Sequence, residues 1–189
     1  MFLTAEGGSL WDYAYFLRAL AGAQFTVVSG YPGPVDAILA VERGEADGIC
    51  GLENRTIRSL RPQWFEPGQK LANFLLQTAM EPHPDLVKRG IPEMWPMIPA
   101  DHRKVVDLIV AQQAFQRPFI APPGTAPAQL KVLLEAFMAT WKDPEALEDA
   151  NRMKIDVNPK SGEEVAALAK GIYGAPKDLV DRMSKAIRP

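Results

Sequence analysis

Proline sets the strongest limit on what this chain can fold into. The 189 residues include 17 prolines, and a proline breaks a helix interior and removes a backbone donor from a strand. The prolines gather in two stretches, residues 82–99 and 118–127. We therefore expect long irregular connections in these stretches, with compact elements between and around them.

The composition is that of a globular protein and excludes several function classes. Hydrophobic residues make up 47% of the chain and charged residues 23%, enough apolar material for one domain or two small lobes. The net charge of -2 gives no electrostatic case for a nucleic acid or an anionic membrane. Cys50 is the only cysteine, so an intrachain disulfide is excluded. No apolar run approaches the ~18 residues that span a bilayer.

Helical and strand-like patterns alternate through residue 121. We expect helices at residues 9–21, 35–43, 54–60 and 101–114, strands at 25–29 and 46–51, and an extended segment at 117–121. Periodicity does not decide between strand and helix for residues 71–78. The alternation predicts an α/β lobe with a largely parallel sheet.

The part of the chain after residue 127 is mostly helical. Asp143 and Pro144 predict a helix start, because proline suits the first helical position. Ser161 and Glu164 have the spacing of a capping box and predict a second start. A last helix is expected from Lys177.

Three groups of segments, taken in order, resemble one family of transport proteins. They are residues 27–33 with 40–48, residues 117–124, and residues 142–145 with 159–164 and 172–173. The ordered set resembles the receptor component of tripartite tricarboxylate transporters, the Bug or TctC-type periplasmic solute-binding proteins. The resemblance covers the chain from about residue 9 to its end.

The resemblance implies a fold and a division of the chain. It implies an α/β, periplasmic-binding-protein-like (type II) lobe at residues 1–116. A helical C-terminal segment, residues 117–189, would return to the first lobe in a full-length member. This chain resembles only the later part of such a receptor. A shortened receptor, an engineered fragment and a divergent short gene product all fit that pattern.

The resemblance also implies a function. It implies a non-enzymatic receptor that captures a small organic carboxylate and passes it to membrane transporter subunits, with no cofactor, no metal and no catalytic residue. The family is periplasmic, yet residues 1–9 lack the basic region and hydrophobic core of a signal peptide. We therefore expect no signal peptide in this chain.

Two loops carry the predicted ligand site. Gly7, Gly8 and Ser9 precede the first helix, where backbone N–H groups and a hydroxyl can donate to a carboxylate. Gly30 and Tyr31 follow a predicted strand, and ligands of open α/β sheets bind at the carboxyl ends of strands. The alternatives are an ordinary capped helix start and a turn with a partly buried tyrosine.

Further charged and aromatic residues have two interpretations each. The resemblance makes Asp47 a cleft residue, whereas the sequence alone indicates a turn carboxylate. Arg55, Arg58 and Arg61 share nearly one helix face, which is typical of a solvated surface and less often of an anion-attracting one. Trp64 and Trp95 fall in loop-like stretches, where either side chain could be exposed because the missing lobe of a full-length receptor would cover it.

Nothing in the sequence forms a catalytic or metal-binding pattern. Cys50 lies among glycines, where a small buried side chain is expected, and neither His83 nor His102 has metal-ligand spacing to another ligand. Two alternatives to a receptor remain. One is an interaction or dimerisation module that has lost ligand binding, and the other is a small α/β hydrolase-like enzyme using Ser9, which lacks the G-x-S-x-G pattern. A homodimer could also supply the second wall of a half-formed site.

Overall fold

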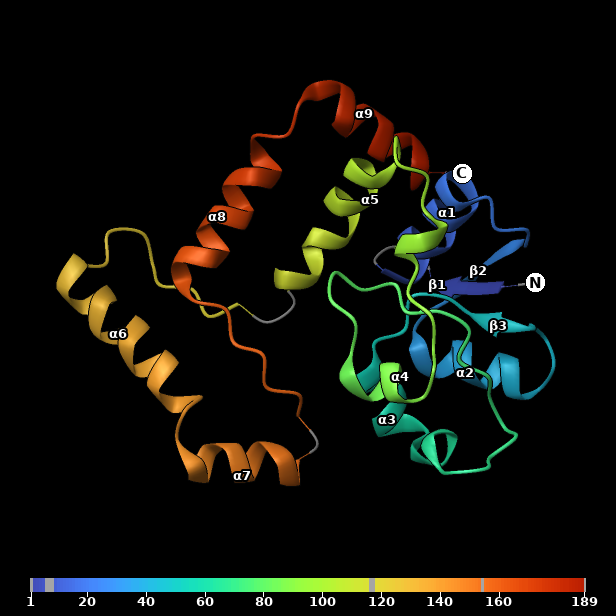
Figure 1. The fold of residues 1–189 in the computed structure, drawn as a ribbon, viewed down its shortest axis with the longest axis horizontal. Helices are drawn as coiled ribbons and strands as arrows, with labels where there is room; N and C mark the ends of the chain where they lie inside the picture. Colours follow the sequence, from blue (N-terminus) through green and yellow to red (C-terminus); the bar gives the residue numbers. More distant parts are fainter. Residues whose placement is uncertain (1, 6–8, 116–117, 154, 189) are drawn as a thin grey trace. The chain divides into compact units, whose positions relative to one another are not determined.

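A computed structural model describes residues 2–5, 9–115, 118–153 and 155–188, and most of these residues are helical (Figure 1). The chain divides into two compact units, one formed by Met1–Val110 with Ala175–Pro189 and the other by Ala111–Gly174. The sequence predicted a different division, between residues 1–116 and 117–189, which separates the lobes of a receptor. That division is not tested by the two compact units and stays a prediction.

The first unit contains a small sheet and most of the buried side chains. Its strands are β1 (Phe2–Ala5), β2 (Val27–Tyr31) and β3 (Gly48–Ile49). Its helices are α1 (Ser9–Ala21), α2 (Pro34–Glu42), α3 (Asn54–Leu60), α4 (Pro84–Lys88), α5 (Arg103–Val110) and α9 (Lys177–Ala186), with 3₁₀ turns η1 (Pro62–Phe65) and η2 (Trp95–Met97).

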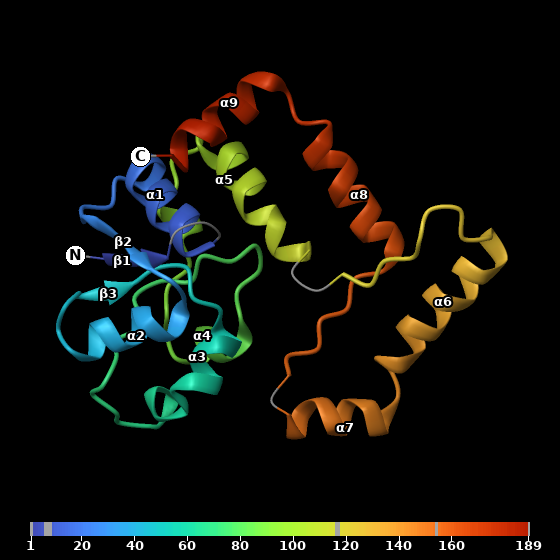
Figure 2. The same cartoon turned by 180° about the vertical axis from the view of Figure 1, so that it is seen from behind.

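The three strands pair in parallel in the order β2-β1-β3, so β1 is central (Figures 1 and 2). Helix α2 contributes Ala37 and Ala40 to a cluster with Tyr31 and Ile49. Helix α1 instead packs into a separate, larger cluster that includes Val27. The two helices that follow β1 and β2 thus bury their apolar faces in different clusters.

An extra residue in β2 separates these clusters. Val28 pairs with Leu3 but Tyr31 pairs with Ala5, so β2 carries one residue more than β1 between the two pairs. Gly30 lies in this bulge with φ of +103°, a conformation that glycine adopts readily. Because side chains alternate along a strand, one extra residue places Tyr31 in the α2 cluster while Val27 remains in the α1 cluster.

The predicted fold class is wrong. The strands have only four, five and two residues, and the described chain is mostly helical, which is not a type II periplasmic-binding-protein-like lobe with a largely parallel sheet. Residues 71–78 contribute one isolated bridge, from Gln77 to Glu93, and residues 118–121 form no strand. The buried Gln77 amide donates to the Ile91 carbonyl oxygen at 2.8 Å, so a side chain anchors this loop, which is neither the strand nor the helix that the pattern left open.

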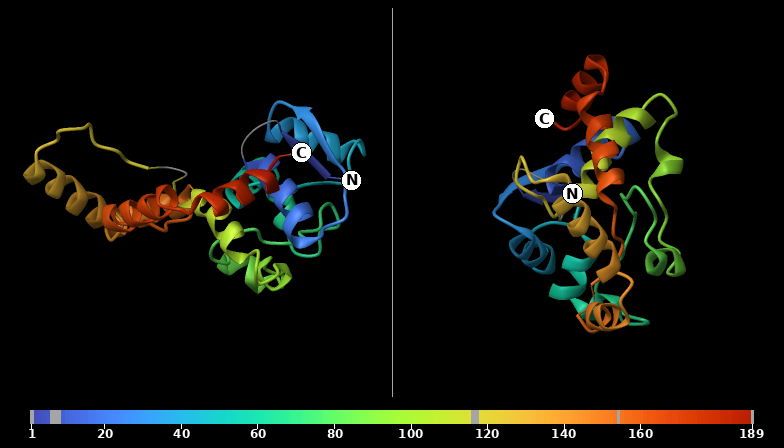
Figure 3. Two further views of the ribbon diagram at one scale, coloured as in Figure 1. Left: turned by 90° about the horizontal axis from the view of Figure 1, so that it is seen from above. Right: turned by 90° about the vertical axis from the view of Figure 1, so that its left-hand side faces the viewer.

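The main core joins α1, α5 and α9. Phe16, Val105, Val106 and Val110 are fully buried in it. Helices α5 and α9 lie side by side in every view (Figures 1, 2 and 3). The valines of α5 share one face at helical spacing, which explains why this short helix is held by packing.

The second unit is built differently. It contains η3 (Ala111–Phe115), α6 (Pro127–Thr140), α7 (Pro144–Arg152) and α8 (Gly162–Tyr173). The predicted helix starts are confirmed, because the Asp143 carboxylate accepts from two backbone N–H groups of α7 and Ser161 forms a complete capping box with Glu164.

The second unit buries little apolar surface. Among its described residues, the buried apolar ones are Ala111 and Ala150. Large apolar side chains are exposed instead: Phe119, Ile120, Leu130, Val132, Leu133, Leu134, Leu147, Met153 and Tyr173. Helices α7 and α8 thus have side-chain caps, but the described part of this unit buries little apolar surface to hold its helices together.

We predict that the two units differ in local stability. Amide protons of α6, α7 and α8 should show protection factors at least about tenfold lower than those of α1 and α5, because few buried apolar contacts oppose local opening. Hydrogen–deuterium exchange at low protein concentration measures this difference. Equal protection in both units would contradict the prediction and would mean that another surface covers α6, α7 and α8.

We also predict that the bulge in β2 requires glycine. Gly30→Ser should lower the free energy of unfolding by about 1–2 kcal/mol, because a side chain is strained at this positive φ. Gly33 has an extended φ of -174° and is the N-cap of α2, so Gly33→Ser should leave stability unchanged or raise it by a few tenths of a kcal/mol. Urea denaturation compares the two variants, and an equal effect at both positions would refute the strain argument.

Candidate functional site

The structure places part of the predicted ligand site. Gly7 and Gly8 lie outside the described residues, and Ser9 is the first residue of α1. Gly30 forms the bulge of β2, and Tyr31 ends that strand at its carboxyl end and packs against α2. The tyrosine is therefore at the edge of the sheet that the sequence indicated, and it is partly buried.

Asp47 lies at the other edge of the sheet. It is exposed and directly precedes β3, at the amino end of that strand. Tyr31 pairs with Ala5 whereas Gly48 pairs with Phe2, so Tyr31 and Asp47 are about four strand positions apart along the strand direction, or ~13 Å at ~3.3 Å per residue. The central strand β1 separates them further. The structure does not bring Asp47 and Tyr31 together.

A buried amide lies beyond the carboxyl end of β3. The side-chain nitrogen and oxygen of Asn54, the first residue of α3, are both buried and have no hydrogen-bond partner among the described residues. A buried polar group without a partner costs about 1–3 kcal/mol of stability. Sequence analysis did not single out this residue, since only its surroundings make it unusual.

The arginines of α3 have structural partners. Arg61 forms a two-pronged ion pair with Glu42, with N–O distances of 2.5 and 2.6 Å, and this pairing lowers the pKa of the Glu42 carboxyl. Arg58 donates to Asp85 at 3.2 Å and stacks on the Phe65 ring at 4.2 Å from its centroid. Two of the three arginines on this face thus connect α3 to neighbouring segments.

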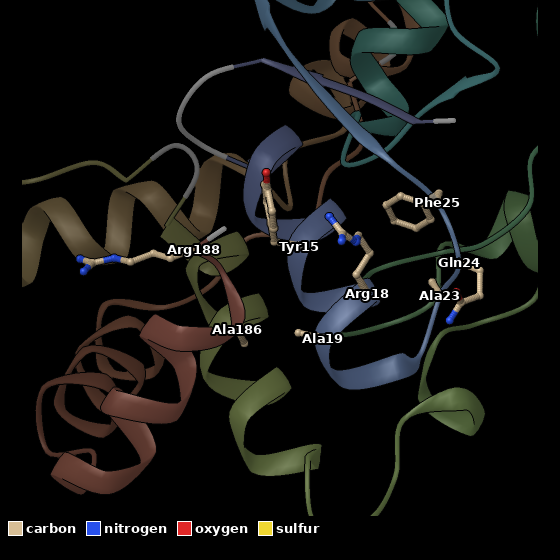
Figure 4. A pocket seen from close by; sticks show the side chains of 8 residues that line it. All are labelled: Tyr15, Arg18, Ala19, Ala23, Gln24, Phe25, Ala186 and Arg188. Atoms are coloured by element: carbon tan, nitrogen blue, oxygen red, sulfur yellow. The ribbon is translucent and has the colours of Figure 1, made fainter.

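One pocket of about 470 Å³ lies within the first unit (Figure 4). Tyr15, Arg18 and Ala19 of α1 form one side of it, at the i, i+3 and i+4 positions of a single helix face. Gln24 and Phe25 approach from the segment before β2, and Ala186 and Arg188 from the end of α9. Ala23 completes the lining.

The polar groups of this pocket are mainly hydrogen-bond donors. The guanidinium carbon of Arg18 lies 5.8 Å from the centroid of the Tyr15 ring, a cation–π distance. The amide of Gln24 donates to the Gly22 carbonyl oxygen at 3.2 Å. Among the described residues, no aspartate or glutamate lines the pocket. The pocket therefore has positive charge and suits an anion.

The surrounding contacts hold the pocket in place. Leu17 and Leu20 present carbonyl oxygens near the end of α1, and these meet the Ala23 N–H at 3.0 Å and His102 Nδ1 at 3.0 Å. The Trp11 indole donates to the Ile187 carbonyl oxygen at 3.2 Å, which fixes the chain next to Arg188. Sequence analysis missed this pocket, although the shared face of Tyr15, Arg18 and Ala19 was a readable signal.

His83 caps a helix and Cys50 is buried in the core. His83 Nδ1 accepts from the Asp85 N–H and caps α4. Cys50 is buried, as predicted, and burial raises the pKa of its thiol to about 12. Within the described ranges, no three His, Cys, Asp or Glu residues are grouped so as to hold a metal.

The comparisons with known proteins leave the family open. No family model, curated protein or solved structure matches the chain. The resemblance to TctC-type receptors stays a prediction, as does the absence of enzymatic activity. Across the described parts of the chain, no helix combines the length and apolar character needed to cross a membrane.

We predict that Cys50 makes stability fall at high pH. Above its ordinary pKa of 9.0 the thiol ionises in the unfolded chain, while the folded chain keeps the proton until about pH 12. The folded state then binds more protons, so the free energy of unfolding should fall as pH rises, by up to about 1.4 kcal/mol per unit from this group.

The matched control for this prediction is Cys50→Ala. This variant retains the slope due to tyrosines and lysines and loses the slope due to the thiol, so the stability difference between the two proteins should change between pH 9 and 12. Urea denaturation at several pH values measures it. Parallel stability curves would show that burial does not hold the proton on Cys50.

Proposed function

We propose that this chain is a non-catalytic binding protein for a small organic carboxylate, acting as all or part of a receptor for a tripartite tricarboxylate-type transporter. The observation that carries the proposal is the pocket of the first unit, whose described lining residues include two arginines and no carboxylate side chain. The ordered sequence motifs support the receptor role independently.

Arginine suits this task for a physical reason. Its planar guanidinium offers parallel N–H donors that match the two oxygens of a carboxylate. Arg18 is exposed, and among the described residues it forms no ion pair. Its guanidinium is held near the Tyr15 ring, which limits the freedom that the side chain loses on binding a ligand.

The pocket is open to solvent, which limits the affinity. An exposed ion pair contributes about 0–1 kcal/mol. We therefore expect a dissociation constant on the order of millimolar for a small acid in this pocket alone. A second wall, from a transporter subunit or a second copy of the chain, would exclude water and strengthen the same contacts.

The test is thermal unfolding with a panel of organic acids at 10 mM, against sodium chloride of equal ionic strength. At ten times the dissociation constant, a ligand stabilises the fold by about 1.4 kcal/mol, which is a melting shift of about 3–6 °C. Arg18→Gln should remove the shift. Arg55→Gln, which changes an exposed arginine outside the pocket, should retain it.

The melting shifts distinguish binding in the pocket from binding elsewhere and from no binding. A shift that both variants retain would place the acid elsewhere on the chain. No shift with any acid, in a protein that melts cooperatively, would refute carboxylate capture.

The second unit favours another candidate function, a dimerisation module. Its exposed apolar side chains include Phe119 at 81% and Tyr173 at 92% exposure, and exposed apolar surface of this kind is typical of protein contacts. Sedimentation velocity across a concentration series would detect a dimer. A monomer at all concentrations would exclude this function for the isolated chain.

A further inference from the structure

Aromatic rings and methyl groups form part of the pocket walls, beside the polar side chains of Arg18, Gln24 and Arg188. Tyr15 and Phe25 contribute rings, and three alanines, Ala19, Ala23 and Ala186, contribute methyl groups. Such a lining favours a flat apolar body on the ligand, because rings stack with one another at centroid distances of about 4.5–7 Å.

The charges of the pocket are not spread evenly. Figure 4 shows Tyr15, Arg18 and Phe25 in one group, with the Arg18 side chain between the two rings. The guanidinium of Arg188 points away from this group. One cation therefore accompanies the two rings, and the second cation stands apart from them.

We propose, on the basis of the proposed function, that this pocket selects an aromatic monocarboxylate. The carboxylate pairs with Arg18 and the ring of the ligand lies against Tyr15 and Phe25. A tricarboxylate such as citrate would find one cation in this group for its three carboxylates, because the Arg188 guanidinium points away from it. The volume of about 470 Å³ is within the range of small-molecule pockets and admits an acid of one or two rings.

The first experiment compares three acids by isothermal titration calorimetry with the full chain. Benzoate is the flat probe, cyclohexanecarboxylate has the same charge and similar size without an aromatic ring, and citrate is the highly charged probe. We expect benzoate to bind about threefold to tenfold more tightly than cyclohexanecarboxylate, the range of aromatic pair interactions. Citrate should bind more weakly than both.

The second experiment removes one ring. Phe25→Leu should bring the affinities for benzoate and cyclohexanecarboxylate close to each other, since the stacking partner is lost while an apolar side chain remains. Phe119→Leu, the same change at an exposed ring outside the pocket, should keep the wild-type preference. The ratio of the two affinities in the unchanged protein tests the proposal even where Phe25→Leu does not fold.

The results that would overturn the aromatic preference differ from those that would overturn carboxylate capture. Binding of citrate at least as tight as that of benzoate, with loss of citrate binding in Arg18→Gln, would overturn the aromatic preference and retain carboxylate capture. Equal affinity for benzoate and cyclohexanecarboxylate in the wild type would also overturn the preference. Absence of binding for all three acids would overturn both.

Discussion

The packing of α9 against α1 and α5 is the contact on which the first unit depends. It places Ala186 in the same buried cluster as Phe16 and Val106, and the Trp11–Ile187 hydrogen bond joins residues 176 positions apart. Closing so long a loop costs conformational entropy, but this cost grows only slowly with length. The apolar surface buried among three helices offsets it. The same contact creates the pocket, because Ala186 and Arg188 line it only when α9 is in place.

Local backbone chemistry made several helix boundaries predictable from the sequence. Asp143 caps α7 and Ser161 caps α8 as expected, and α2 begins at Pro34, one residue before the predicted start. These signals act within about four residues and need no tertiary partner. Burial of Cys50 was also predictable from its neighbours in the sequence. It lies among glycines, where a small buried side chain is expected, and the structure buries it.

The fold class and the pocket were not predictable in the same way. A strand forms only beside a partner, and apolar runs such as residues 71–78 carry no information on whether a partner exists. Trp64, which could be exposed if a missing lobe covers it in a full-length receptor, is instead buried with Ile38 and Phe65. Arg188 joins Arg18 at one pocket through tertiary packing alone, and no spacing rule connects residues so far apart.

The pocket of the first unit and the apolar side chains of the second unit are both exposed to water. The first has exposed cationic donors in an open pocket, where an anion gains little because water competes for the same groups. The second has apolar side chains that nothing described in the chain covers, and covering them is favourable by about 25 cal/mol per Å². A polypeptide surface that covered the pocket would exclude this water and strengthen the contacts of the anion. Association and ligand capture would then be coupled, and by thermodynamic linkage each would strengthen the other by the same factor.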